Sequence, residues 1–200
     1  MILSLKDAFQ FAQEKHQGQK KPGTQSPYLF HPLGVASLVL KFGGSDSQAA
    51  AALLHDTIGD SSITHSTITS RFNKEVADLV FAFADPEIAE NLEAMKEDDR
   101  WRTLKKAYLG KLPGVLEEAL LIIACEELHD LEELLFGVRY EGFHVWDRYP
   151  VHGMQVFWYY KELLSLFNKR LSAPKYQQLV SEFARHVREL QGLTMEGNPA

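Results

Sequence analysis

The chain has 200 residues, of which 45% are hydrophobic, and its formal net charge is -6. This length and composition suit a folded domain and exclude a disordered chain. The negative charge argues against general binding to the nucleic-acid backbone, so we expect no nucleic-acid partner.

Cysteine content and the N-terminal sequence bear on the compartment. The single cysteine, Cys125, excludes an internal disulfide framework and fits a reducing environment. The start MILSLKDAF lacks the charged and apolar regions of a secretory signal. We find no window with the roughly 18 apolar residues that a membrane span needs. These features predict a cytoplasmic protein with no membrane partner.

Apolar residues recur at helical spacing along most of the chain, whereas the alternating pattern of β-strands is almost missing. The sequence therefore predicts an all-α fold. Ser45 and Gln48 form a capping box for one helix, and Pro32 suits the first turn of another. The predicted helices span residues 5–16, 32–42, 46–57, 64–72, 74–84, 101–112, 115–136, 151–171 and 173–190. The acidic segment DPEIAENLEAMKEDD (85–99) predicts a loop or a mobile lid.

The stretch AALLHDTIGD (51–60) runs from an apolar helix face into the adjacent residues His55 and Asp56. Neighbouring side chains on an α-helix point about 100° apart, so these two would reach one ion only near a helix end. The dipole at a helix C-terminus favours a cation there. Imidazole with carboxylate suits Mn, Fe, Zn or Ni. The pair indicates a metal site; the alternative is an ordinary His-Asp dipeptide without a metal.

Two other residues are candidate ligands. His31 lies at the entrance of the helix at 32–42, and Glu126 interrupts the apolar run of the longest helix. A buried carboxylate is costly unless it is paired or binds a metal. The alternative for Glu126 is that its face of the helix reaches solvent. We interpret His16 and His129 as packed, hydrogen-bonded histidines rather than ligands.

The ordered segments FAQEKHQGQKK, PYLFHPLGVA, AALLHD, FNKEVADLV and CEELHD resemble the HD-domain phosphohydrolases. Within this family the chain is similar to the (p)ppGpp hydrolases of the RelA/SpoT type and to their stand-alone bacterial relatives. The resemblance, over about residues 5–170, implies an HD-domain helical bundle with additional C-terminal helices. It implies a single domain over residues 1–200, with a core of about 4–140 and a C-terminal extension of about 141–192.

The resemblance also implies the site. One divalent ion, usually manganese in this family, would be bound by His31, His55, Asp56 and Glu126; Fe, Ni, Zn and Mg are alternatives. The family reaction removes the 3′-pyrophosphate from a guanosine nucleotide, so the implied partner is a purine nucleotide. Asp60 matches an acid of the family motif H-D-x-x-E-D that helps to set up the attacking water.

Gly59 departs from that motif, because it replaces the first acid. We expect it to end the helix in the left-handed conformation that glycine favours. The loss of the acid leaves open a second function, a metal- and nucleotide-binding protein with little or no hydrolysis.

The substrate positions depart as well. Near the last motif, Glu127, Asp130 and Glu132 replace neutral or cationic residues and would repel a polyphosphate. Asp130 is nevertheless a candidate substrate-binding residue by its position. Lys20 and Lys21 keep positive charge near the expected nucleotide site, although they are also typical of a solvated loop.

A third function is a helical interaction module. Its partner surface would consist of aromatic residues near the C-terminus, namely Phe143, Trp146, Tyr149, Phe157, Trp158, Tyr159 and Tyr160. Aromatic residues at helical spacing are more often part of the core. The sequence therefore favours the metal-dependent phosphohydrolase over this module.

Overall fold

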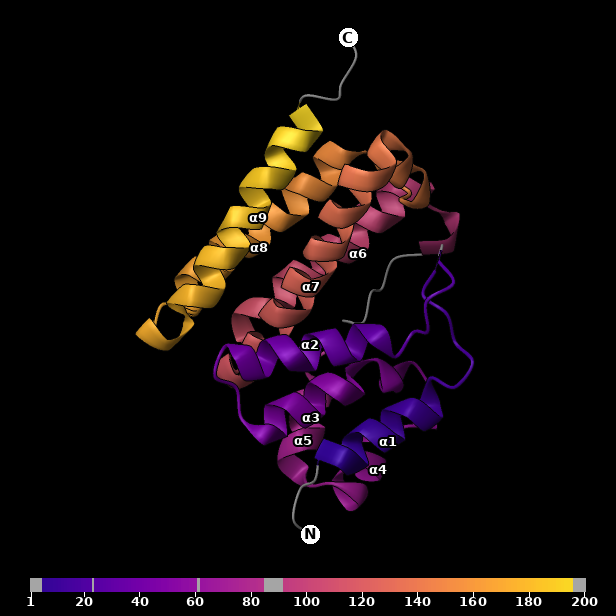
Figure 1. Cartoon of the computed structure of the whole chain (residues 1–200), viewed down its shortest axis with the longest axis vertical. Coiled ribbons are helices and arrows are strands. Elements are labelled where there is room, and N and C mark those ends of the chain that lie inside the picture. Colours follow the sequence, from indigo (N-terminus) through magenta and orange to yellow (C-terminus); the bar gives the residue numbers. More distant parts are fainter. Residues whose placement is uncertain (1–4, 23, 61, 85–91, 196–200) are drawn as a thin grey trace. The chain divides into compact units, whose positions relative to one another are not determined.

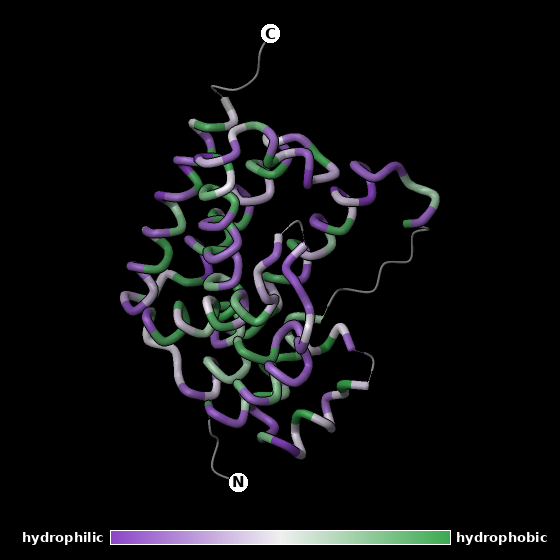
Figure 2. The backbone as a smooth tube through the Cα atoms, turned by 45° about the vertical axis from the view of Figure 1, so that its right-hand side comes forward, coloured by the Kyte–Doolittle hydropathy of each residue, from purple (hydrophilic) through white to green (hydrophobic). Residues whose placement is uncertain are grey.

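A computed structural model describes residues 5–22, 24–60, 62–84 and 92–195 (Figure 1). The described residues are mostly α-helical and form no β-strand, which confirms the predicted all-α fold. Most helices carry both apolar and polar residues, as expected for helices that bury one face (Figure 2). In this part of the chain, no helix combines the length and the apolar character needed to cross a membrane.

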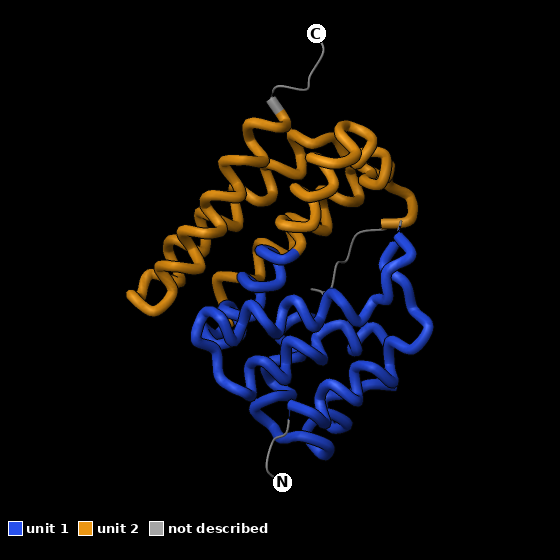
Figure 3. The backbone as a smooth tube through the Cα atoms, viewed as in Figure 1, with its two compact units in different colours: residues 1–84, 116–129 blue, residues 85–115, 130–200 orange. Residues whose placement is uncertain are grey.

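The chain divides into two compact units (Figure 3). Unit 1 comprises residues 1–84 and 116–129, and unit 2 comprises residues 85–115 and 130–200. The longest helix, α7 (Glu117–Glu141), therefore contributes its first half to unit 1 and its second half to unit 2. The division into a core of 4–140 and an extension of 141–192 stays a prediction.

Unit 1 is organised around a short, buried helix, α3. The helices of this unit, besides the start of α7, are α1 (Leu5–Lys15), α2 (Phe30–Lys41), α3 (Asp46–Leu54), the 3-10 helix η1 (His55–Gly59), α4 (His65–Arg71) and α5 (Lys74–Phe81). α3 contacts α1, α2 and α5. Its four consecutive alanines, residues 49–52, are fully buried. Such small side chains let the neighbouring helices approach closely.

The ends of α3 decide where the candidate ligands lie. It begins with the predicted capping box between Ser45 and Gln48. Its α-helical geometry ends at Leu54, and the tighter helix η1 continues from His55. The helix predicted for residues 46–57 is therefore two elements, and the His-Asp pair lies where one changes into the other. Side chains of adjacent residues in a 3-10 helix point about 120° apart.

Gly34 of α2 lies directly against His129 of α7 within unit 1. A Cβ atom built on Gly34 would be 2.0 Å from His129 Nε2, which is far inside van der Waals contact. The buried His129 ring also places its Nδ1 3.3 Å from His31 Nδ1. Because glycine has no side chain, His129 can pack at residue 34 and keep its contact with His31.

Unit 2 is built mainly from the second half of α7 and two long helices. Its elements are η2 (Leu92–Ala94), α6 (Glu97–Lys111), η3 (Leu112–Gly114), the rest of α7, η4 (Gly142–Arg148), α8 (Gly153–Arg170), η5 (Pro174–Tyr176) and α9 (Gln177–Met195). α8 packs against α9 through Phe167 and Phe183, whose ring centroids are 5.1 Å apart. Arg170 at the end of α8 donates hydrogen bonds to backbone carbonyls of residues 112, 113 and 115, and so fixes the chain after α6.

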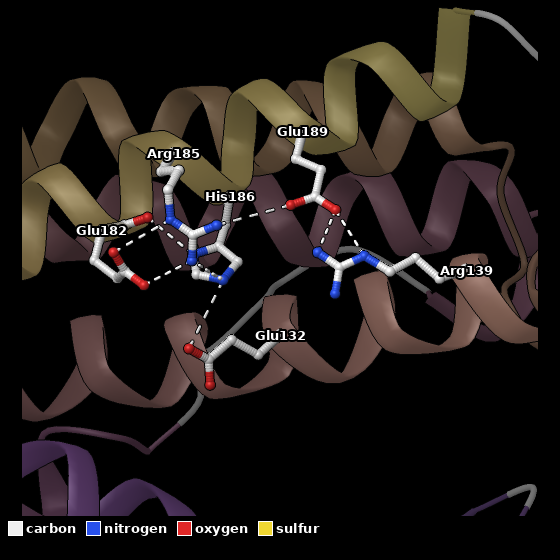
Figure 4. Close-up of polar contacts among 6 residues, drawn as sticks. All are labelled: Glu132, Arg139, Glu182, Arg185, His186 and Glu189. Atoms are coloured by element: carbon white, nitrogen blue, oxygen red, sulfur yellow. Dashed lines mark hydrogen bonds and ion pairs between the residues drawn. The ribbon is translucent and has the colours of Figure 1, made fainter.

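A polar network joins α9 to the second half of α7 (Figure 4). Its members are Glu132, Arg139, Glu182, Arg185, His186 and Glu189. Arg139 donates to Glu189 at 2.8 Å, and Nε2 of the buried His186 lies 3.8 Å from Glu132 Oε1. Glu132, one of the acidic residues expected to repel a polyphosphate, therefore faces a histidine of its own unit.

Several predicted helix boundaries were wrong: α7 continues to Glu141 beyond the predicted residue 136, and α9 spans Gln177–Met195 rather than 173–190. α2 starts at Phe30, two residues before Pro32, and α6 starts at Glu97 rather than Trp101. The first turn of α6 contains three acidic residues, which favour the positive end of the helix dipole. Residues 97–99 are thus helical rather than part of the predicted loop or lid, of which residues 85–91 lie outside the described residues.

The Gly34 contact predicts a sensitive position. We expect Gly34→Ala to lower the free energy of unfolding by about 1–3 kcal/mol, because His129 must move to admit the methyl group. Gly110→Ala is the matched control: a Cβ there meets no heavy atom within 4 Å, so alanine should raise the stability of α6 by up to about 1 kcal/mol. Urea unfolding measures both. Equal stability of Gly34→Ala and wild type would contradict the contact.

Candidate metal centre

Three of the four predicted metal ligands lie close together in unit 1. Asp56 Oδ2 is 3.6 Å from His31 Nε2 and 3.2 Å from His55 Nε2. One ligand atom from each residue lies within 4.8 Å of the other two. Two imidazoles from different elements and one carboxylate therefore face a common point, as binding of a single ion requires.

Glu126 lies beside these three residues. Its Oε1 atom is 3.9 Å from His55 Nε2, and 20% of its side chain is exposed. The helix face that carries Glu126 is thus neither dry nor fully solvated, and the carboxylate is close enough to share an ion with His55. Its role as the fourth ligand stays a prediction.

His55 supplies the test of whether this site suits a metal. Its side chain is 2% exposed, and Nδ1 lies 2.7 Å from the Ala52 carbonyl oxygen. Because a carbonyl only accepts, Nδ1 carries a proton, and in the neutral ring Nε2 then presents its lone pair. Among the described residues, buried Nε2 has no hydrogen-bond partner. A buried acceptor directed at carboxylates is costly unless a cation lies between them, so the residues fit a metal ion.

The protonation state of His31 agrees with this arrangement. Burial, with a smaller contribution from His55, lowers the pKa of His31 to about 3, against the opposing effect of Asp56. The imidazole is therefore neutral at physiological pH. Neutral imidazole is the form that binds metals.

Tyr28 is a contributor that the sequence analysis missed. Its hydroxyl donates a hydrogen bond of 2.9 Å to Asp56 Oδ2 and so orients the carboxylate. The signal in the sequence was the segment PYLFHP, in which Tyr28 precedes His31 by three residues, close to one helical turn.

A pocket of about 310 Å³ lies beside Asp56 in unit 1. It is lined by Lys15, His16, Gln19, Tyr28, Asp56, Thr57, Gly59 and Asp60. The buried His16 places its Nδ1 2.9 Å from Gln19 Oε1, and its ring packs on that of Tyr28 at 4.9 Å. The pocket therefore adjoins the candidate metal ligands on one side and the end of α1 on the other.

Asp60, the predicted catalytic residue, lines this pocket. Its carboxylate accepts hydrogen bonds from Ser62 N at 2.9 Å and from Lys15 Nζ at 3.1 Å. The hydrogen bonds from Ser62, and then that from Lys15, lower the pKa of Asp60 to about 2. Asp60 is thus ionised at neutral pH and is a weak base but a good hydrogen-bond acceptor.

The predicted left-handed conformation of Gly59 was wrong. Among the described residues, the glycines with positive φ are Gly18, Gly43 and Gly142. The chain leaves η1 through Asp60 in an extended conformation, with φ -81° and ψ 111°. The backbone therefore does not require glycine at residue 59. A Cβ atom there would meet no heavy atom within 4 Å, so no steric contact requires glycine at this position either.

The two candidate substrate-binding lysines lie on a loop that folds back on itself. Lys20 Nζ donates to the backbone oxygen and to Oε1 of Gln25, at 3.2 and 3.0 Å. Lys21 Nζ lies 6.0 Å from the ring centroid of Phe30. The described residues that line the pocket include neither of them but include Lys15, which the sequence analysis missed. Its signal was its place directly before His16.

The acidic residues near the last motif are not equivalent. Glu127 is buried in unit 1, whereas Asp130 is an exposed residue of unit 2. Contact between Asp130 and a substrate stays a prediction.

Comparison with known proteins identifies related sequences. Residues 8–137 match the family described as HD domain. The guanosine-3′,5′-bis(diphosphate) 3′-pyrophosphohydrolase of Aquifex aeolicus (strain VF5) is 43% identical over 76 residues, or 38% of this chain and 11% of that protein. The enzyme of the same name, MESH1, from Xenopus tropicalis is 31% identical over 131 residues, or 64% of this chain and 68% of that protein. The match thus spans about a tenth of the first relative and two thirds of the second.

Two solved structures resemble the fold. One, described as a metazoan ortholog of SpoT that hydrolyses ppGpp, has a TM-score of 0.68 at 20% identity and covers 94% of this chain and 96% of that chain. The other, a protein of Listeria monocytogenes EGD-e, has a TM-score of 0.64 at 23% identity and covers 80% of this chain and 97% of that chain. Likeness at these identities shows the fold.

The contacts of Asp60 predict a measurable change in its titration. Lys15→Ala removes a donor that stabilises the charged carboxylate, so we expect the pKa of Asp60 to rise from about 2 toward its usual value of 3.8. Ser62 remains and should keep the pKa below that value. Carboxyl-carbon NMR titration measures the shift, with Lys41→Ala as a control on another helix. An unchanged Asp60 titration would contradict the ion pair.

Proposed function

Because the chain belongs to the HD domain family, we propose that it is a metal-dependent phosphohydrolase that removes the 3′-pyrophosphate from a guanosine nucleotide of the (p)ppGpp type. HD domains bind a divalent metal. The observation that carries the proposal is the buried lone pair of His55 Nε2, which faces the carboxylate of Asp56 beside a pocket. The names of the Aquifex and Xenopus relatives support the choice of substrate.

Four residues of this chain would hold the ion: His31, His55, Asp56 and Glu126. Two imidazoles with two carboxylates suit Mn²⁺, and we propose manganese over iron, nickel, zinc or magnesium. When bound, a divalent ion polarises a phosphoryl oxygen and makes water more acidic.

The surrounding residues would orient the reacting groups. The hydroxyl of Tyr28 holds Asp56 in place. The Asp60 carboxylate would accept a hydrogen bond from the attacking water and set its direction. With a pKa of about 2, Asp60 would not take the proton of that water efficiently at neutral pH.

Gly59 limits the rate of this reaction. The loss of a positioned general acid or base typically costs about 10²–10⁴ in rate. We therefore propose slow hydrolysis, and product release distinguishes it from nucleotide binding without turnover.

His55 provides the direct test of the metal centre. Wild-type protein loaded with Mn²⁺ should release pyrophosphate from ppGpp, and His55→Ala should lose both the bound metal and the release. His144→Ala, at an exposed histidine of η4, is the matched control and should retain both. Metal content by mass spectrometry and a pyrophosphate assay give the two readouts. Metal-loaded wild-type protein that releases no pyrophosphate from ppGpp would contradict the proposed activity.

Restoring the missing acid tests how Gly59 limits the rate. At saturating ppGpp we expect Gly59→Glu to raise kcat by about 10² or more, because a Cβ atom at residue 59 meets no heavy atom within 4 Å and a carboxylate would again manage a proton. Gly59→Gln has nearly the same size without the charge and should not raise kcat. Single-turnover kinetics at saturating Mn²⁺ measure the change. Equal rates for the two variants would mean that the absent acid does not limit turnover.

A further inference from the structure

The pocket beside Asp56 combines free space with a positive charge. A Cβ atom built at residue 59 would meet no heavy atom within 4 Å, so glycine leaves open space at this position of the pocket lining. At the end of α1, the Lys15 side chain is 31% exposed and lines the same pocket. Gly59 thus leaves space at the pocket lining, and Lys15 adds a positive charge to it.

The charges that line the pocket favour an anion once a cation is bound at Asp56. Lys15 contributes one positive charge, and Asp56 and Asp60 contribute two negative charges, which gives a formal sum of -1. A divalent cation changes this sum to +1. A glutamate at residue 59 would return it to zero and would occupy part of the volume. Glycine therefore lowers the repulsion of a phosphate group.

Lys15 is held where it can contact such a group. The Gln19 amide nitrogen donates to the Lys15 carbonyl oxygen at 3.3 Å, and Gln19 Oε1 accepts from His16 Nδ1 at 2.9 Å. These bonds fix the backbone at the end of α1, while the ammonium group is bound only to Asp60, at 3.1 Å, among the ion pairs of the described residues. Exposed ion pairs contribute little to stability, so the ammonium can turn from Asp60 to a phosphate oxygen.

The volume limits which part of a ligand enters. At about 310 Å³ the pocket lies at the lower end of ligand sites, which typically span about 300–1,000 Å³. It suits a small anionic group better than a whole nucleotide.

We propose that Gly59 and Lys15 form a selectivity site for the terminal phosphate of a pyrophosphoryl group. Gly59 supplies the volume, and Lys15 donates to the terminal phosphate oxygens. The proposal rests on the proposed function and deepens it, because it assigns to two residues of this chain the choice of a pyrophosphoryl over a monophosphoryl ligand.

Binding of simple anions tests the role of Gly59. Calorimetry compares pyrophosphate with inorganic phosphate on the Mn²⁺-loaded protein, in excess Mg²⁺ so that pyrophosphate is the same magnesium complex for every variant. We expect wild type and Gly59→Ala to prefer pyrophosphate. Gly59→Gln should lower this preference through its size, and Gly59→Glu should lower it by about a further fivefold through its charge. An unchanged preference in Gly59→Glu would overturn the role of glycine.

A second set of variants tests Lys15. Lys15→Ala should weaken pyrophosphate binding by about fivefold and leave phosphate binding nearly unchanged, because only the terminal phosphate reaches the lysine. Lys15→Arg keeps the charge and should restore the preference. Lys41→Ala, at an exposed lysine outside the pocket, should behave as wild type. Equal loss of both anions in Lys15→Ala would overturn the role of Lys15.

These measurements separate the two proposals, because binding needs no turnover. If ppGpp is not hydrolysed but the variants change the anion preference as expected, the selectivity site is supported and the proposed activity fails. If ppGpp is hydrolysed and both Gly59→Glu and Lys15→Ala keep the wild-type preference, the selectivity site alone is overturned. Equal metal content in all variants shows that the metal centre is intact.

Discussion

The candidate metal centre depends on the hydrogen bond between His55 Nδ1 and the carbonyl oxygen of Ala52. This bond lies inside the most buried part of unit 1, so it fixes the ring and its tautomer together. Asp56 Oδ2 lies 3.2 Å from the other nitrogen, at the point where α3 ends and the 3-10 helix η1 begins. The dry alanine-rich helix and the polar site are therefore parts of one arrangement, in which burial makes the unused lone pair costly and a cation favourable.

The site has a buried part and an exposed part with different constraints. His31 and His55 are held by packing and by hydrogen bonds within unit 1, so their geometry is tied to its fold. Lys15, Gly59 and Asp60 line the open pocket, where side chains can change without disturbing the core. Loss of one acid at residue 59 is thus compatible with an unchanged arrangement of the candidate metal ligands. Divergence of chemistry and retention of metal binding need not conflict in this fold.

The sequence predicted what depends on neighbouring residues. Helical periodicity and the capping box at Ser45 were confirmed, since both are local. Contacts between distant segments, such as Tyr28 with Asp56 and Lys15 with Asp60, were missed because spacing alone does not show which loop returns to a site. The conformation of Gly59 was predicted wrongly because the helix was expected to end at residue 57, whereas η1 continues through Gly59 and the next residue, Asp60, is extended.

The contact between Gly34 and His129 has a consequence for how such chains diverge. A methyl group at residue 34 and the imidazole of His129 cannot occupy this place together, so the size of the residue at one position limits the size at the other. A larger residue at one position demands a smaller residue at the other, or a displaced helix. Because His129 Nδ1 lies 3.3 Å from His31 Nδ1, such an exchange would remove a neighbour of this candidate ligand. We therefore expect natural variants to change both positions together, a relationship that neither residue reveals alone.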